Sequence, residues 1–151
     1  MSKEFEMVEF LNKIEQFKLL DTIEFENIQK IINIRFLENP TSINKSYSIF
    51  TLDLENSIEL LSGAEFRKPN DVTRNNEGLI ELFMKSNCGI TQDHIISLFG
   101  LPRWGYPPPN WVKNSLLYLL YDFNNLKLNF GFPFKGEDCL DSVVLNYFKK
   151  N

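Results

Sequence analysis

The spacing of apolar residues changes along the chain, and this change constrains the fold more than any other feature of the sequence. Between residues 3 and 20 the apolar side chains recur every three or four positions, as they do in an amphipathic helix. A second helix is predicted to open at Asp21 or Thr22, since Asp21 has an acid three residues later as in a capping box, and to stop before Pro40. From Ser48 onward apolar and polar residues alternate, which predicts strands.

Six strands are predicted, three on each side of a short helix. The helix spans residues 91–99, with Thr91 as its N-cap and Gly100 as its terminator. A polar segment between residues 68 and 78 is predicted to be a loop. The expected strands are residues 48–54, 58–66, 79–84, 115–123, 126–132 and 140–149.

The two groups of strands resemble each other. The run Leu52–Asn56 is matched by Tyr121–Asn125, and each run follows a helix and precedes a third strand. We therefore predict an α+β fold in one domain, 1–151, with an N-terminal helix (1–20) and two helix-plus-three-strand units (21–86 and 87–151) whose helices pack on one face of antiparallel sheet. The residues expected in the core are Phe50, Leu52, Leu54, Leu79, Ile95, Leu98, Phe99, Leu116, Tyr118, Leu128, Phe130, Val144 and Leu145.

Composition narrows the function classes. The chain has 151 residues, a net charge of -4 and 43% hydrophobic residues, which fits a single globular domain. Its pI of about 5.1 argues against a nucleic-acid binder, which needs a basic face. No apolar run is long enough for a membrane span and the first residues lack a secretory signal, so we expect a cytoplasmic protein. In that compartment Cys88 and Cys139 are expected to remain thiols.

The residues that could carry catalysis are few. His94, the one histidine, falls in the first turn of a predicted helix, where exposure is the usual state. A Cys88 and His94 nucleophilic pair has no evident orienting acid. No CxxC or HExxH spacing and no glycine-rich strand-to-helix loop occurs, so we expect no enzyme activity, no metal and no cofactor.

The strongest candidate for a binding surface is a proline-rich segment with aromatic residues. Three consecutive prolines hold the backbone extended, and the flanking residues Arg103, Trp104, Tyr106 and Trp111 are of the types that dominate binding hot spots. The alternative is that the tryptophans fold back over the sheet edge. Acids near the last hairpin form a second candidate surface that suits a basic partner, and the acidic first helix is a third. The hairpin acids are Glu137, Asp138 and Asp141.

The second half of the chain resembles a known module. The pattern comprises residues 89–102, Trp111, and the segments 118–121, 126–130 and 140–145. It is similar to the helix-then-three-strand module of β-lactamase-inhibitor-like proteins and small outer-membrane assembly lipoproteins, and such modules also occur in cytoplasmic immunity proteins of bacterial contact-dependent toxin systems. The resemblance implies an antiparallel sheet and binding of other proteins, and it transfers no catalytic residue. The chain departs from the exported members in lacking a signal peptide and a lipidation cysteine.

These observations support two hypotheses. The first is a cytoplasmic immunity protein that binds and neutralises a bacterial toxin domain, expected to be a basic nuclease, without contacting nucleic acid or membrane itself. The second is a small-ligand-binding protein or enzyme with a pocket between the sheet and the Trp104–Trp111 loop, near His94. A large toxin gene beside the coding sequence would favour the first.

Overall fold

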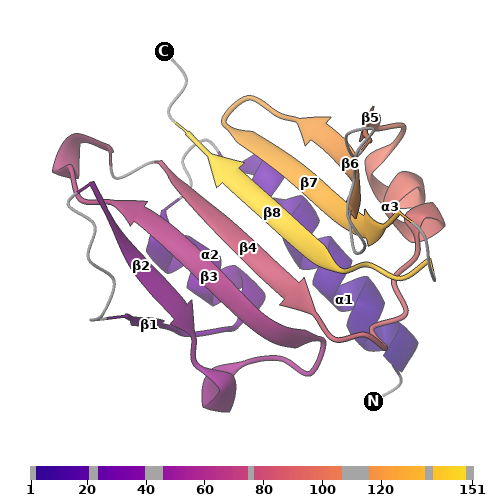
Figure 1. Cartoon of the computed structure of the whole chain (residues 1–151), viewed down its shortest axis with the longest axis horizontal. Coiled ribbons are helices and arrows are strands. Elements are labelled where there is room, and N and C mark those ends of the chain that lie inside the picture. The colour runs from indigo at the N-terminus through magenta and orange to yellow at the C-terminus, as the bar shows by residue number, and fades with distance from the viewer. Residues whose placement is uncertain are drawn as a thin grey trace.

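The computed structural model describes residues 3–20, 24–39, 46–74, 77–106, 116–134 and 138–148. Its main feature is an eight-stranded antiparallel sheet with the order β1-β2-β3-β4-β8-β7-β6-β5 (Figure 1). The strands are β1 (Phe36–Glu38), β2 (Tyr47–Leu52), β3 (Leu61–Pro69), β4 (Gly78–Met84), β5 (Arg103–Gly105), β6 (Leu116–Asp122), β7 (Leu126–Pro133) and β8 (Ser142–Tyr147).

The strand order has a mirror arrangement about its centre. Strands β1 to β4 and strands β5 to β8 each follow one another across half of the sheet, and the last strand of each half, β4 and β8, pair at the middle. Each half contains one helix followed by a strand of three residues and three longer strands. This order is the one that two tandem units joined through their last strands would produce.

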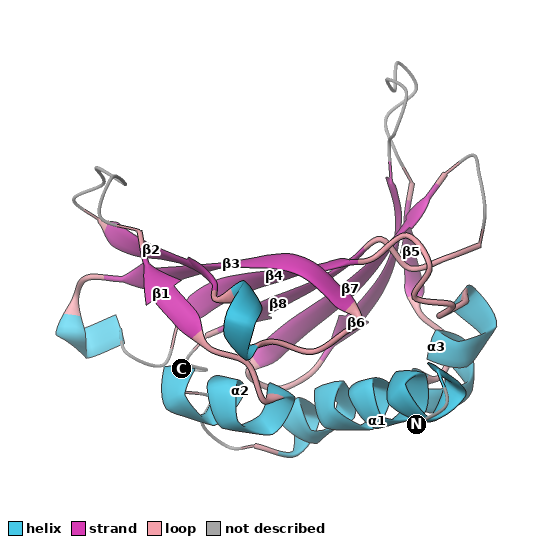
Figure 2. Ribbon diagram, turned by 90° about the horizontal axis from the view of Figure 1, so that it is seen from below, coloured by secondary structure: helices cyan, strands magenta, loops and turns pink. Residues whose placement is uncertain are grey.

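Three α-helices lie on one face of the sheet. They are α1 (Lys3–Gln16), which continues as the 3-10 turn η1 (Phe17–Leu19), α2 (Phe25–Ile32) and α3 (Gln92–Phe99). Figure 2 shows α1 and α2 running beneath the strands, and no described helix crosses the opposite face. The prediction of an α+β fold with N-terminal helices and an antiparallel sheet is confirmed. None of the described helices is long and apolar enough to cross a membrane.

The core lies between the helices and the facing side of the sheet. Alternate residues of the central strands are buried: β4 contributes Ile80 and Leu82, and β8 contributes Val143 and Leu145. Phe66 of β3 is fully buried at the centre of an aromatic cluster that also includes Phe25, Phe36, Phe50 and Tyr147.

The predicted core is only partly correct. Four of the expected residues are buried, namely Ile95, Leu128, Phe130 and Leu145. The prediction that Leu54 is in the core is wrong, because Leu54 lies in the 3-10 turn η2 (Leu54–Asn56) and is 70% exposed. The others are half-buried, and four of them, Leu79, Leu116, Tyr118 and Val144, point to the side of the sheet away from the helices.

Several boundaries also differ from the prediction. The helix predicted to open at Asp21 or Thr22 begins instead at Phe25, because its N-cap Glu24 is extended and makes no side-chain cap. The short edge strands β1 and β5 were not expected. The segment predicted as a loop from residue 68 is still strand β3 as far as Pro69, and it then forms the 3-10 turn η3 (Val72–Arg74).

Candidate functional site

The side of the sheet opposite the helices, here called the open face, carries three rows of side chains that run across the strands. The pairing register defines each row, and each row is named after the feature that distinguishes it from the other two. The groove row is Ile49, Arg67, Leu79, Asn146, Lys127 and Asp122; the acidic row is Thr51, Glu65, Glu81, Val144, Asn129, Leu120 and Arg103; the glycine row is Gly63, Phe83, Ser142, Gly131, Tyr118 and Gly105.

The acidic row has an unfavourable pairing at its centre. Glu81 of β4 stands directly opposite Glu65 of β3, although like charges in cross-strand pairs are destabilising. Glu65 accepts a hydrogen bond of 2.8 Å from Arg67, whereas no ion pair of the described residues includes Glu81. Burial, followed by the charge of Glu65, raises the pKa of Glu81; the charge of Arg67 opposes this rise, and the charge of Asp141 adds to it. We call Glu65, Glu81 and Asp141 the acidic cluster.

The neighbouring glycine row contains a large aromatic residue, Tyr118, beside Gly131. Tyr118 of β6, Gly131 of β7 and Ser142 of β8 are successive register partners. A Cβ atom at Gly131 would lie 2.8 Å from Ser142 Oγ and 3.0 Å from Tyr118 Cε1, so only glycine leaves room for these two side chains. Burial, and less strongly the charges of Glu81 and Asp141, raises the pKa of the Tyr118 phenol. The half-buried residues Phe83 and Tyr118 of this row, here called the apolar platform, lie beside the acidic cluster.

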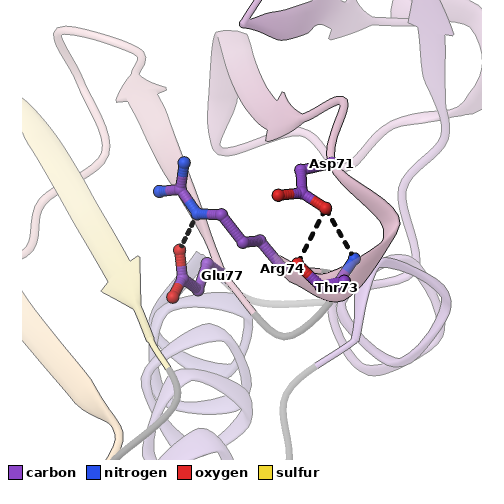
Figure 3. Close-up of polar contacts among 4 residues, drawn as sticks. All are labelled: Asp71, Thr73, Arg74 and Glu77. Carbon is purple, nitrogen blue, oxygen red and sulfur yellow. Dashed lines mark hydrogen bonds and ion pairs between the residues drawn. The ribbon is translucent and has the colours of Figure 1, made fainter.

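Four residues of the groove row, Arg67, Leu79, Asn146 and Lys127, line a groove of about 510 Å³. Its lining includes three cations, Arg67, Arg74 and Lys127, and one acid, Glu77. Turn η3 forms part of the wall, where Arg74 Nε donates to Glu77 at 2.5 Å (Figure 3). Asp71 fixes this turn by accepting hydrogen bonds from the backbone amide and hydroxyl of Thr73, which lower the pKa of Asp71. The groove is therefore net basic, in contrast to the acidic cluster beside it.

The residues of the predicted aromatic surface lie at the β5 edge of the sheet. Arg103 is on the open face and forms an ion pair with Asp122 of β6. Trp104 is the next residue of β5, is 41% exposed and pairs with Leu119, whose side chain is in the core. Tyr106 follows the strand and is 68% exposed. Trp111 lies outside the described residues. The strand thus separates Arg103 and Trp104 onto opposite sides of the edge.

The predicted acidic surface is also divided. The carboxylate of Asp138 accepts a hydrogen bond of 3.1 Å from the backbone amide of Gln92, the first residue of α3. Asp141 belongs to the acidic cluster through its effect on Glu81. Glu137 lies outside the described residues. Asp138 therefore stabilises a helix terminus, while the charge of Asp141 acts on Glu81 in the candidate site.

The residue considered for catalysis, His94, has a structural role. Its Nδ1 accepts a hydrogen bond of 3.0 Å from the backbone amide of Thr91, while the Thr91 side chain accepts from the His94 amide. These bonds form the capping box of α3, which confirms Thr91 as the predicted N-cap. His94 and Trp104 do not line the basic groove, which lies at the other end of the strands. Among the described residues no group of three or more His, Cys, Asp or Glu side chains could hold a metal ion.

The sequence prediction missed Glu65, Glu81 and the role of Tyr118. Each sits in a strand whose alternate residues are apolar, so the strand pattern could have placed Glu65 and Glu81 on a shared polar face. The pattern of one strand does not reveal its register with the next, and this register is what brings the two carboxylates together.

Comparisons with known proteins identified no family. No family model matches the chain, and no curated protein matches it. A solved structure of a DUF4309 family protein (YjgB) from Bacillus subtilis subsp. subtilis str. 168 is similar over 85% of this chain and 80% of its own, with 12% sequence identity and a TM-score of 0.47.

Proposed function

We propose that this protein binds another protein through the open face of its sheet, and that the partner is a basic bacterial toxin domain that it neutralises in the cytoplasm. The observation that carries the proposal is the acidic cluster at the centre of that face. Glu81 is partly desolvated, faces Glu65 and lies near Asp141, and no ion pair of the described residues includes it. A lysine or arginine from a partner would relieve this repulsion upon binding.

The surroundings of the cluster favour a protein over a free cation. Val144 of β8 is a register partner of Glu81, and Leu79 and Phe83 lie two residues before and after Glu81 on the same side of β4. All three are half-buried, and Tyr118 lies beyond them. A partly desolvated charge with apolar and aromatic neighbours is the usual composition of an interface hot spot. The bound cation would lose water and contact two carboxylates that have apolar neighbours. The low dielectric of these surroundings strengthens the contact.

The choice of a toxin domain rests on the resemblance of the second half of the chain to modules found in immunity proteins. Nuclease toxin domains have basic substrate clefts, which are complementary in charge to the acidic cluster. An immunity protein seated on such a cleft would block it without catalysis. The residues expected to make the contact are Glu65, Glu81, Asp141 and Tyr118, with Arg103, Trp104 and Tyr106 at the periphery.

Growth protection tests this proposal directly. The toxin domain that the proposal expects to be encoded beside this gene is expressed in bacteria with or without the wild-type protein, which is expected to restore growth. Glu81→Lys should abolish the protection, because it places a cation where the partner presents one. Glu55→Lys is the matched control, since Glu55 is exposed in turn η2 and lies outside the open face.

Both variants are first purified and their thermal unfolding compared with the wild type. A folded Glu81→Lys protein that protects as well as the wild type would refute binding through the acidic cluster. Failure of the wild-type protein to protect cells or to bind the purified toxin domain would refute the immunity function itself.

The basic groove favours a second candidate function, binding of a small anion. Arg67 and Arg74 each use Nε in an ion pair, and Lys127 makes no ion pair within the described part of the chain. Inorganic phosphate is a suitable probe, and a rise in melting temperature with phosphate that is lost in Lys127→Ala but kept in Lys30→Ala would support this function. Lys30 is exposed on α2, away from the groove.

A further inference from the structure

Two cysteines that are far apart in the sequence lie in contact in the fold. Cys88 follows β4 and Cys139 precedes β8, 51 residues later, and their Sγ atoms are 3.5 Å apart. Neither is disulfide-bonded. A disulfide needs an S–S distance of about 2.05 Å, so the sulfurs are within a small side-chain adjustment of bonding distance.

Hydrogen bonds hold the two cysteine segments against each other. The thiol of Cys88 donates to the carbonyl of Leu140, and the thiol of Cys139 donates to the carbonyl of Ser86, both at 3.4 Å. The backbone amide of Leu140 also donates to the carbonyl of Ile90 at 2.8 Å. These crossed contacts fix the approach of the two sulfurs, because each segment is bonded to the other on both sides of the thiol pair.

The two thiols differ in access to solvent. Cys88 is fully buried, whereas Cys139 is partly exposed. A small oxidant in solution can therefore reach Cys139 but not Cys88. This asymmetry assigns separate roles to the two sulfurs, since thiol–disulfide exchange needs one thiolate that attacks and a second that resolves the mixed disulfide.

We propose that Cys88 and Cys139 form a reversible oxidation site that closes an intramolecular disulfide in the presence of a low-molecular-weight disulfide. The thiolate of Cys139 attacks a sulfur of oxidised glutathione, the glutathione S–S bond breaks, and one glutathione leaves as a thiolate. Cys88 then loses its proton and attacks Cys139 Sγ, which displaces the second glutathione. Two protein thiols are oxidised, and one glutathione disulfide is reduced to two thiols.

The disulfide would join the two halves of the sheet at one end of its centre. It would link the segment after β4 to the segment before β8, the two strands that pair across the middle. The closed loop contains α3 and β5 to β7. Because a cross-link restricts the unfolded chain more than the folded one, oxidation should raise the melting temperature and reduction should reverse the rise.

The test is incubation of the folded, reduced protein with oxidised glutathione, followed by alkylation, intact mass measurement and thermal unfolding. The expected product is a monomer lighter by two hydrogens that takes up no alkylating agent and melts several degrees higher than the reduced protein. Dithiothreitol should restore two alkylated thiols and the original melting temperature.

Single variants separate the two roles. Cys88→Ser should stop at a stable glutathione adduct on Cys139, while Cys139→Ser should remain almost unreacted because Cys88 is buried. Two outcomes overturn the proposal: a wild-type protein that accumulates the glutathione adduct on Cys139 without closing the disulfide, or one whose disulfide joins two molecules. Circular dichroism of each variant confirms that it is folded before the reaction is measured.

Discussion

At the scale of single residues, Glu81 gives the clearest test of the electrostatics. Burial, Glu65 and Asp141 raise its pKa in the folded state above the ordinary value of 4.5. The folded protein therefore binds the proton more tightly than the unfolded chain, and this contribution to stability is present below pH 4.5 and lost as the pH rises through the folded pKa. Ionised Glu81 should destabilise the protein at neutral pH.

We expect Glu81→Gln to raise the melting temperature at neutral pH and to lose this advantage as the pH falls below the ordinary glutamate pKa. Thermal unfolding of the wild type and the variant across that pH range measures the effect. Glu55→Gln controls for the removal of one charge outside the cluster. A difference between wild type and Glu81→Gln that does not change with pH would contradict the assigned cause.

Gly131 tests the packing of the glycine row. Its missing Cβ leaves room for Ser142 Oγ and Tyr118 Cε1, which would lie 2.8 and 3.0 Å from a Cβ atom. We expect Gly131→Ala to lower the free energy of unfolding by about 1–3 kcal/mol, as overpacking usually does. Gly63→Ala is the matched control, because its Cβ would meet Phe83 at an ordinary 3.6 Å. Urea denaturation that finds equal effects at both glycines would disprove this explanation.

At the scale of elements, the N-terminus of α3 depends on contacts within the helix and from outside it. The Thr91 hydroxyl accepts from the His94 amide, and Asp138 accepts from the Gln92 amide. We expect Thr91→Ala to lower the free energy of unfolding by about 1 kcal/mol, the usual cost of losing an N-cap. Ser97→Ala, at an exposed position of the same helix, should change it by only a few tenths of that amount. Chemical denaturation distinguishes the two, and equal losses would show that the cap contributes nothing specific.

The elements predicted best from the sequence are those whose ends are marked by capping residues. Thr91 and Gly100 mark both ends of α3, which was predicted at its observed position. The helix at Phe25 was placed too early: the spacing of Asp21 and Glu24 matches a capping box, but Glu24 is itself the N-cap of α2 and its backbone is extended. Helix propensity and residue spacing are local signals, and they do not predict that the backbone of Glu24 is extended.

The short edge strands could not be predicted for a different reason. Strands β1 and β5 are three residues long, which is too short for alternation to be recognised. They are strands because β2 and β6 offer unpaired edges to them. The same limit applies to the candidate site, where cross-strand register brings Glu65 and Glu81 together although nothing in either strand alone indicates it.

At the scale of the whole molecule, the helices cover only one side of an eight-stranded sheet (Figure 2). The open face combines a net basic groove, an acidic cluster and an apolar platform within three adjacent rows. Antiparallel sheets can keep one face in solvent, but such a face is usually polar. Half-buried Leu79, Phe83, Tyr118 and Val144 on this face are the feature that a bound protein would explain.

The most direct test of the central claim is the kinetics of binding between the wild type or its variants and the purified toxin domain that the proposal expects to be encoded beside the gene. Three variants each represent one surface: Glu81→Lys for the open face, Trp104→Ala for the β5 edge and Glu4→Lys for the acidic first helix. We predict that Glu81→Lys weakens binding by at least tenfold, about 1.4 kcal/mol, mainly through faster dissociation, and that Glu4→Lys leaves the affinity unchanged. Binding by folded Glu81→Lys at the wild-type affinity, together with a tenfold loss in Glu4→Lys or Trp104→Ala, would contradict the account and move the interface to that other surface.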